Sequence, residues 1–279
     1  MAATLLDAVS AVLVLVLVAL GLAVVFGMMR VINMAHGELV MLGAFTVVWL
    51  QGWHVPFWGC VIAAAVVVGF FGWMIEWVLV RHTRDRPLDT ILATWGLSLV
   101  LKQAIVLLFG PGSHSVPLPL DAMVGLGALN YPAYRLVVMA IAAVVIAGTY
   151  LFLRRTNRGL ATRAVMARPA TAELLGFNTD RTYSATFAAG AALAGLAGAL
   201  VAPLVSVDPQ MGLGYLVPAF LAILVGGAGA LGGVLAGGSA VGASTSLLGA
   251  LWSPVTVQIV VFGLAVAVIR LRPQGLMRE

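Results

Sequence analysis

Charged side chains are scarce in this chain. Asp, Glu, Lys and Arg make up only 9% of the 279 residues, whereas hydrophobic residues reach 62% and the mean hydropathy is +1.09. Soluble domains carry about 25% charged residues. A water-soluble domain of this length has no means of burying so much apolar surface, so the sequence predicts a protein whose solvent is lipid.

Cysteine and lysine are almost missing as well. The single cysteine, Cys60, excludes an intrachain disulfide framework and any cysteine-cluster metal site. The single lysine, Lys102, lies within an apolar run, so the chain contains no P-loop of the form G-x-x-x-x-G-K-[ST], and it has no zincin, nucleophile-elbow or dinucleotide motif. We therefore predict a protein that is not an enzyme and has no metal or cofactor of its own. Uphill transport by such a chain would need a partner or an ion gradient.

Apolar runs of helical length fill most of the sequence. A membrane-spanning helix needs about 20 apolar residues, and the runs here are continuous, unlike the short alternating segments of a lipid-facing barrel. We predict an all-α, polytopic membrane helical bundle forming one domain over residues 1–279. It would have eight to nine membrane segments, and the short glycine-rich segments would be broken half-helices. The runs cover roughly residues 8–26, 37–51, 56–80, 90–109, 133–153, 182–205, 214–229, 232–250 and 255–270.

The arginines lie almost entirely in alternate loops. They cluster just after residue 80, within residues 154–181 and after residue 269, whereas residues 110–132 and the other loops of the opposite set contain no Lys or Arg. The positive-inside rule makes the arginine side cytoplasmic, which with nine crossings places the N-terminus outside and the C-terminus inside. The same rule explains the formal charge of +5 without nucleic acid as a partner.

Two stretches interrupt the apolar pattern, one in each half of the chain. Residues 26–38 include the polar side chains of Asn33, His36 and Glu38, and residues 226–233 are rich in glycine. Paired interruptions of this kind indicate the substrate path of a transporter, because freed backbone at membrane depth must be buried in protein or line a cavity. Solvation at a membrane end is the alternative for the first stretch, and close packing of small residues for the second. The hinge candidates are Gly226, Gly227, Gly229, Gly232 and Gly233.

A polar stripe follows one face of the fourth run. Thr94, Ser98 and Lys102 recur at intervals of four residues, and Trp95 is adjacent to them. A charge at such a depth costs at least about 2.5 kcal/mol, so Lys102 either snorkels to the outer interface, faces a pathway or bridges two helices. We take the candidate substrate path as Asn33, His36, Glu38, Thr94, Trp95, Ser98 and Lys102.

Residues 154–181 form the longest polar segment. Pro169 suits the first position of a helix and Gly176 suits the position after its end, so a two-turn helix is expected between them. This helix would present Leu174 and Leu175 on the cytoplasmic side, either to a partner groove or to the chain's own bundle.

The stretch G-L-A-V-V-F-G-M-M-R-V-I-N-M-A-H-G-E-L-V-M-L-G-A, residues 21–44, closely resembles permeases of the branched-chain amino acid ABC importer family, first-permease type. Residues 163–176 (R-A-V-M-A-R-P-x-x-A-E-L-L-G), 193–200, 226–238 and 272–276 (R-P-Q-G-L) extend the resemblance over nearly the whole chain. The resemblance implies residence in the bacterial cytoplasmic (inner) membrane. It also implies a homologous second permease, two cytoplasmic ATPase subunits that bind ATP-Mg, and a soluble substrate-binding protein. The coupling helix would comprise Arg163, Arg168, Pro169, Glu173, Leu174, Leu175 and Gly176.

The substrate branch is a separate question. Residues 86–99, R-P-L-D-T-I-L-A-T-W-G-L-S-L, look like the urea permease branch, and on this basis we expect urea or short-chain amides, with branched-chain amino acids as the alternative. Two other classes of function remain open from the residues alone. One is an ion-coupled carrier that uses Glu38, Glu76 or Lys102, and the other is a passive amide channel.

Overall fold

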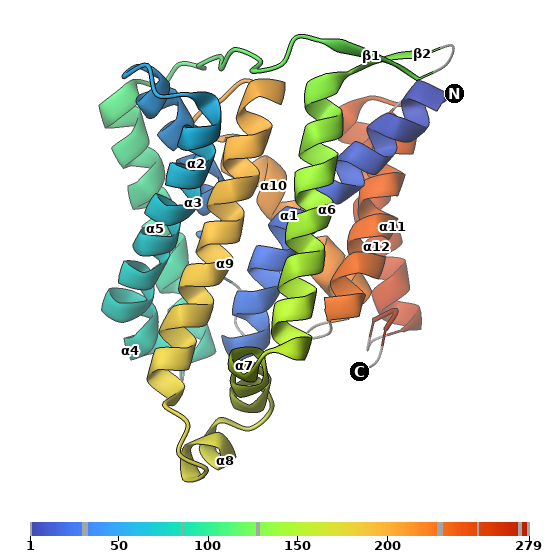
Figure 1. Ribbon diagram of the computed structural model, residues 1–279. Coiled ribbons are helices and arrows are strands. Elements are labelled where there is room, and N and C mark those ends of the chain that lie inside the picture. The colour runs from blue at the N-terminus through green and yellow to red at the C-terminus, as the bar shows by residue number, and fades with distance from the viewer. Residues whose placement is uncertain are drawn as a thin grey trace.

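The computed structural model describes residues 2–29, 33–84, 86–126, 129–227, 231–249, 251–272 and 275–277. Within these residues the protein is an all-α bundle of long, roughly antiparallel helices, as predicted (Figure 1). The long helices are α1 (Ala2–Met29), α2 (His36–Gln51), α3 (Phe57–Ile75), α5 (Pro87–Phe109), α6 (Ala133–Arg155), α9 (Thr179–Val201), α10 (Met211–Gly226), α11 (Leu231–Gly249) and α12 (Pro254–Leu271).

Among the described residues, five helical stretches are long and apolar enough to cross a membrane. They are Thr4–Gly27, Phe57–Thr83, Pro87–Phe109, Ala133–Arg155 and Thr179–Leu204. Met211–Gly226 and Val255–Val268 are apolar but shorter. The nine predicted runs therefore correspond to nine helices with ends shifted by a few residues, whereas a full crossing by each of the short ones stays a prediction.

Helix α9 lies at the centre of the bundle and packs against α1, α2 and α3. Its sequence is rich in alanine and glycine, which lets neighbouring backbones approach closely. A Cβ at Gly198 would collide with the carbonyl of Val40 on α2, and one at Gly43 of α2 would collide with the backbone of Gly195. The glycines of 193–200 are thus packing residues that position α2.

The side predicted to face outwards carries structure that the sequence did not predict. Residues 110–132 include an antiparallel hairpin of β1 (Met123–Leu126) and β2 (Leu129–Pro132), seen at the top of Figure 1. The His114 and Val207 backbones exchange two hydrogen bonds of 2.8 and 2.9 Å, which join this loop to the α9–α10 connection. Asp7 of α1 accepts hydrogen bonds from Tyr131 and from the guanidinium of Arg135. Burial raises the pKa of the Tyr131 phenol.

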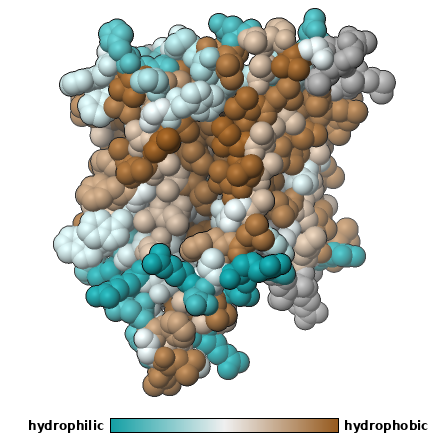
Figure 2. Space-filling view, viewed as in Figure 1, coloured by the Kyte–Doolittle hydropathy of each residue, from teal (hydrophilic) through white to brown (hydrophobic). Residues whose placement is uncertain are grey.

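The opposite side holds the arginine-rich segments. After α3 the chain passes through a π-helical turn (Glu76–Val80) and the short α4 (Arg81–Thr83) on this side. The short η2 turn (Ala202–Leu204) follows α9 at the other end of the bundle, just before Val207. The sequence predicted one helix in residues 154–181, but the structure has two. A further helix, α7 (Asn157–Ala167), precedes the expected one, α8 (Pro169–Leu174). The hydroxyl of Thr156 caps α7 by accepting a hydrogen bond from the Gly159 amide. Figure 2 shows a hydrophilic band at this level, below a largely apolar wall.

Candidate functional site

Helix α2 begins inside the bundle. Its first residue, His36, is buried, and its Nε2 lies 3.2 Å from the carbonyl oxygen of Val18, about 16 Å along α1 from Met29. Residues 33–35 just before it are not helical, yet two of their amides are satisfied: Met34 donates to Thr94 Oγ1 (3.2 Å) and Ala35 donates to Asn33 Oδ1 (3.0 Å). Within residues 33–38 the first interruption is therefore largely buried in protein, which disfavours solvation at a membrane end for this part.

An ion pair joins this broken segment to α5. Lys102 Nζ lies 2.9 Å from Glu38 Oε1, and Ser98 Oγ donates a 2.8 Å hydrogen bond to the same oxygen. The Glu38 side chain is fully buried and that of Lys102 is 15% exposed. Glu38 also occupies the first turn of α2, where the helix dipole favours a negative charge. The sequence left three alternatives for Lys102: snorkelling, facing a pathway or bridging two helices. The bridging role describes this geometry, because the ammonium is held by a carboxylate within the bundle.

The cluster also contains polar atoms with unused hydrogen-bonding capacity. Asn33 Nδ2, His36 Nδ1 and Glu38 Oε2 are buried and have no hydrogen-bond partner among the described residues. Buried polar atoms in proteins are nearly always paired with protein or water. The start of α2 therefore offers both donors and acceptors to a polar solute or to water.

Trp95 does not join this cluster. Its side chain is 57% exposed on the outward face of α5, whereas Thr94 and Ser98 are buried. Neighbouring positions on a helix point about 100° apart, so adjacency in sequence placed Trp95 on the wrong face. The structure brings Glu38, Ser98 and Lys102 together. Thr94 and Asn33 hold the backbone just before α2, and the His36 ring faces Val18 of α1 instead.

A second buried carboxylate lies near the arginine-rich end of the bundle. Glu76 accepts a hydrogen bond from Ser184 of α9, and Arg81 Nη2 lies 3.7 Å from Glu76 Oε2 and 3.1 Å from Ser184 Oγ. Sequence reasoning missed Ser184, because no local spacing relates residues 108 positions apart. This triad ties the π-helical turn after α3 to α9.

The second interruption separates α10 from α11. α10 ends at Gly226, Gly227 has a φ of 111°, and α11 begins at Leu231 with Gly232 and Gly233 in its first turn. The backbones of Gly226 and Gly233 are in close contact, so this break is also a packing site. Gly229 lies outside the described residues, and a hinge motion of these glycines stays a prediction.

The C-terminal tail caps this break, which sequence reasoning missed. Leu276 donates to the carbonyl of Val225 (2.9 Å) and Met277 to that of Gly226 (3.1 Å), so two free carbonyls at the end of α10 are satisfied. Gly275 has a φ of 81° and lies against Gly227. The only sequence signal for this contact was the glycine in R-P-Q-G-L.

Helix α8 projects from the arginine-rich end of the bundle (Figure 1), and its tip is apolar in Figure 2. Pro169 begins it and Gly176 follows it with a φ of 85°, as predicted. Leu174 is 89% exposed and Leu175 is 72% exposed, so neither packs on the chain's own bundle. Glu173 accepts a 2.9 Å hydrogen bond from Thr179 at the start of α9. The remaining coupling candidates are Arg168, which is exposed just before α8, and Arg163, which is exposed on α7.

A family model described as "Branched-chain amino acid transport system / permease component" matches residues 4–269. The chain belongs to this family. It is thus a transport component and not an enzyme, and it is a multi-pass permease of the inner membrane. The motif over residues 21–44, which carried the resemblance, includes the end of α1 and the start of α2.

Named relatives match this permease over most of its length. The high-affinity branched-chain amino acid transport system permease protein LivH of Escherichia coli K12 is 30% identical, over 94% of this chain and 90% of the relative. The corresponding protein BraD of Pseudomonas aeruginosa is 29% identical over the same shares. A probable branched-chain amino acid permease of Methanocaldococcus jannaschii is 26% identical, over 84% of this chain and 76% of the relative. No solved structure shows a significant match.

Proposed function

We propose that this permease is the membrane subunit of an ATP-driven importer that carries branched-chain amino acids into the cell by alternating access. The similarity to relatives named for that transport, over 94% of the chain, supports this substrate. The expectation of urea or short-chain amides rests on residues 86–99 alone. We therefore place branched-chain amino acids first and keep the amides as the rival outcome of the test below.

The proposed assembly contains a homologous second permease, two ATPase subunits that bind ATP-Mg, and a soluble binding protein. In it, α8 is the coupling helix, and Leu174 and Leu175 dock on an ATPase. The contacts beneath α8 support this role, because Ala172 belongs to a small apolar cluster with Val165 and Tyr183 against which Met29 and Met166 also pack. Movement of α8 would thus reach the end of α1, and through α1 the break before α2.

The proposed substrate path runs past Asn33, His36, Glu38, Thr94, Ser98 and Lys102. A zwitterionic amino acid carries one charge of each sign, and the Glu38–Lys102 pair presents one charge of each sign at 2.9 Å. If the charged groups of the amino acid replaced each other's partners within the Glu38–Lys102 pair, no charge would be left unpaired. This matters because an uncompensated buried charge is costly. The glycine break at 226–233 would act as the hinge. All nine long helices would cross the membrane, which places the N-terminus outside.

Co-purification and substrate binding test this proposal. The tagged permease, expressed with its chromosomal neighbours, should co-purify with P-loop ATPases in a stable complex. The partner binding protein should bind leucine in calorimetry and should not bind urea, acetamide or formamide. Amide binding without leucine binding would establish the rival substrate, and uptake by this chain alone without ATP would support an ion-coupled carrier or a channel.

A further inference from the structure

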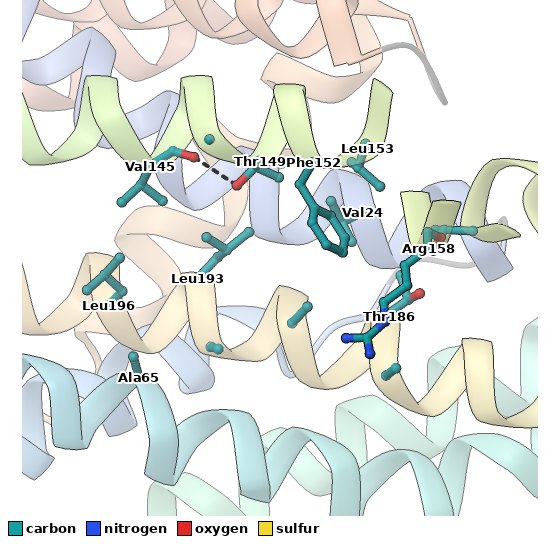
Figure 3. Close-up of a pocket in the computed structure, with 15 residues that line it drawn as sticks. Val24, Ala65, Val145, Thr149, Phe152, Leu153, Arg158, Thr186, Leu193 and Leu196 are labelled. Carbon is teal, nitrogen blue, oxygen red and sulfur yellow. Dashed lines mark hydrogen bonds between the residues drawn. The ribbon is translucent and has the colours of Figure 1, made fainter. Parts of the chain in front are cut away.

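A deep apolar groove of about 650 Å³ opens between α6, α9 and α3 on the cytoplasmic half of the bundle (Figure 3). Part of its lining on α9 consists of small side chains, Ala185, Ala189 and Ala192, which leave room that larger residues would fill. Leu193 and Leu196 of the same helix also line the groove. Val145 and Phe152 of α6 form a wall. The groove shares no residue with the polar cluster of Glu38 and Lys102, so it lies apart from the proposed substrate path.

One end of the groove carries a positive charge. Arg158, in the first turn of α7, is an exposed residue that lines the cytoplasmic end, and Figure 3 shows its guanidinium extending towards α9 near Thr186. Among the described residues Arg158 forms no ion pair. A basic side chain at the cytoplasmic mouth of a pocket between membrane helices fits an anionic lipid headgroup.

The length of the groove matches one leaflet. Val145 and Leu153, both in its lining, are about 12 Å apart along α6 at about 1.5 Å per residue. Half of a hydrocarbon core of about 30 Å is about 15 Å. An acyl chain whose headgroup lies at Arg158 would therefore run along α6 to about the middle of the bilayer.

We propose that this groove binds an anionic phospholipid of the cytoplasmic leaflet, with one acyl chain along α6 and α9 and its phosphate at Arg158. A flexible acyl chain can fill such a groove. If the groove were empty, the side chains of its walls would lose dispersion contacts. A helix from the second permease would fit less well, because an apolar helix supplies no countercharge for Arg158. Occupation of the groove would brace α6 against α9, the two helices that flank α7 and α8.

Native mass spectrometry of the full-length permease tests the proposal. The protein is released from nanodiscs of phosphatidylcholine containing one-fifth phosphatidylglycerol, and the lipids that stay bound are counted. The wild-type protein should retain phosphatidylglycerol in preference to phosphatidylcholine. Arg158→Ala should lower that preference about fivefold, as expected for one arginine near an anionic surface. Ala189→Trp, at an exposed position that lines the groove, should reduce the binding of both lipids.

Arg155→Ala is the matched control, because Arg155 is exposed at the end of α6 but does not line the groove. It should leave the lipid preference unchanged. Thermal melting of each variant separates loss of lipid from loss of fold. The proposal is overturned if well-folded Arg158→Ala retains phosphatidylglycerol as the wild type does, or if a cross-linker at residue 189 captures the second permease instead of lipid.

Discussion

Lys102 of α5 and Glu38 of α2 form a buried ion pair, with 2.9 Å between Nζ and Oε1. The pair connects the middle of a long helix to the first turn of a helix that begins inside the bundle. Ser98 donates a hydrogen bond to the same carboxylate oxygen. The only lysine of the chain thereby holds the broken segment in place.

Replacement of Lys102 should destabilise the permease and impair its transport. Removing one member of a buried pair leaves an uncompensated charge and costs about 3–5 kcal/mol. We expect Lys102→Ala to lower the free energy of unfolding by about this amount and to reduce uptake at equal expression. The double variant Glu38→Gln/Lys102→Met should recover part of the lost stability, because no buried charge is left unpaired. Wild-type uptake and stability in Lys102→Ala would refute the bridging role.

Close contact of α2 with α9 should make Gly198 intolerant of any side chain. A Cβ at Gly198 would lie 1.9 Å from the carbonyl oxygen of Val40, and backbone atoms cannot move aside as a flexible side chain can. We expect Gly198→Ala to cost about 1–3 kcal/mol of stability. The control is Gly263→Ala on α12, where nothing lies within 4 Å of the added atom. The control should be neutral or slightly stabilising, because alanine favours a helix more than glycine does. Equal melting temperatures for the two variants would contradict the packing role.

Local sequence features predicted the helices well. The apolar runs identified each long helix, and Pro169 and Gly176 marked the two ends of α8 because a proline at the start and a glycine after the end act locally. The four-residue spacing of Thr94, Ser98 and Lys102 correctly gave one shared face. These features depend on the chain within a few residues of each position.

Contacts between distant segments were not predictable in the same way. The pairing of Lys102 with Glu38, of Ser184 with Glu76, and of the tail at Gly275 with the end of α10 depends on how the helices pack. Trp95 was misplaced because adjacency in sequence was taken as a shared face. The hairpin at 123–132 was missed because its residues give no clear alternation of apolar and polar side chains.

The contact of the tail at Gly275 with the end of α10 leads to a further prediction. Gly275 and Gly176 both have a positive φ, which costs other residues about 1–2 kcal/mol. Only Gly275 is also crowded, since an added Cβ would overlap the backbone of Gly227. We expect Gly275→Ala to lower the melting temperature clearly more than Gly176→Ala does. The reverse order would show that the tail does not pack on α10.

Exposed leucines on α8 should matter for assembly and not for folding. Leu174→Asp introduces a charge into the proposed ATPase contact, so the complex should dissociate and its transport-coupled ATP hydrolysis should be lost. The isolated permease should melt like the wild type, because Leu174 is 89% exposed. Leu118→Asp makes the same change at a 43% exposed position in the outer loop and should leave the complex intact. Size-exclusion chromatography of the co-expressed subunits distinguishes these outcomes.

Uptake by the reconstituted importer tests the central claim most directly. The permease, its partner permease and both ATPases are placed in proteoliposomes with the binding protein outside and ATP inside, and entry of labelled leucine is measured against labelled urea. We predict leucine uptake that requires both ATP and the binding protein, with no uptake of urea. Urea uptake without leucine uptake, or leucine uptake that persists without ATP, would contradict the assignment of this chain as a permease of an ATP-driven branched-chain amino acid importer.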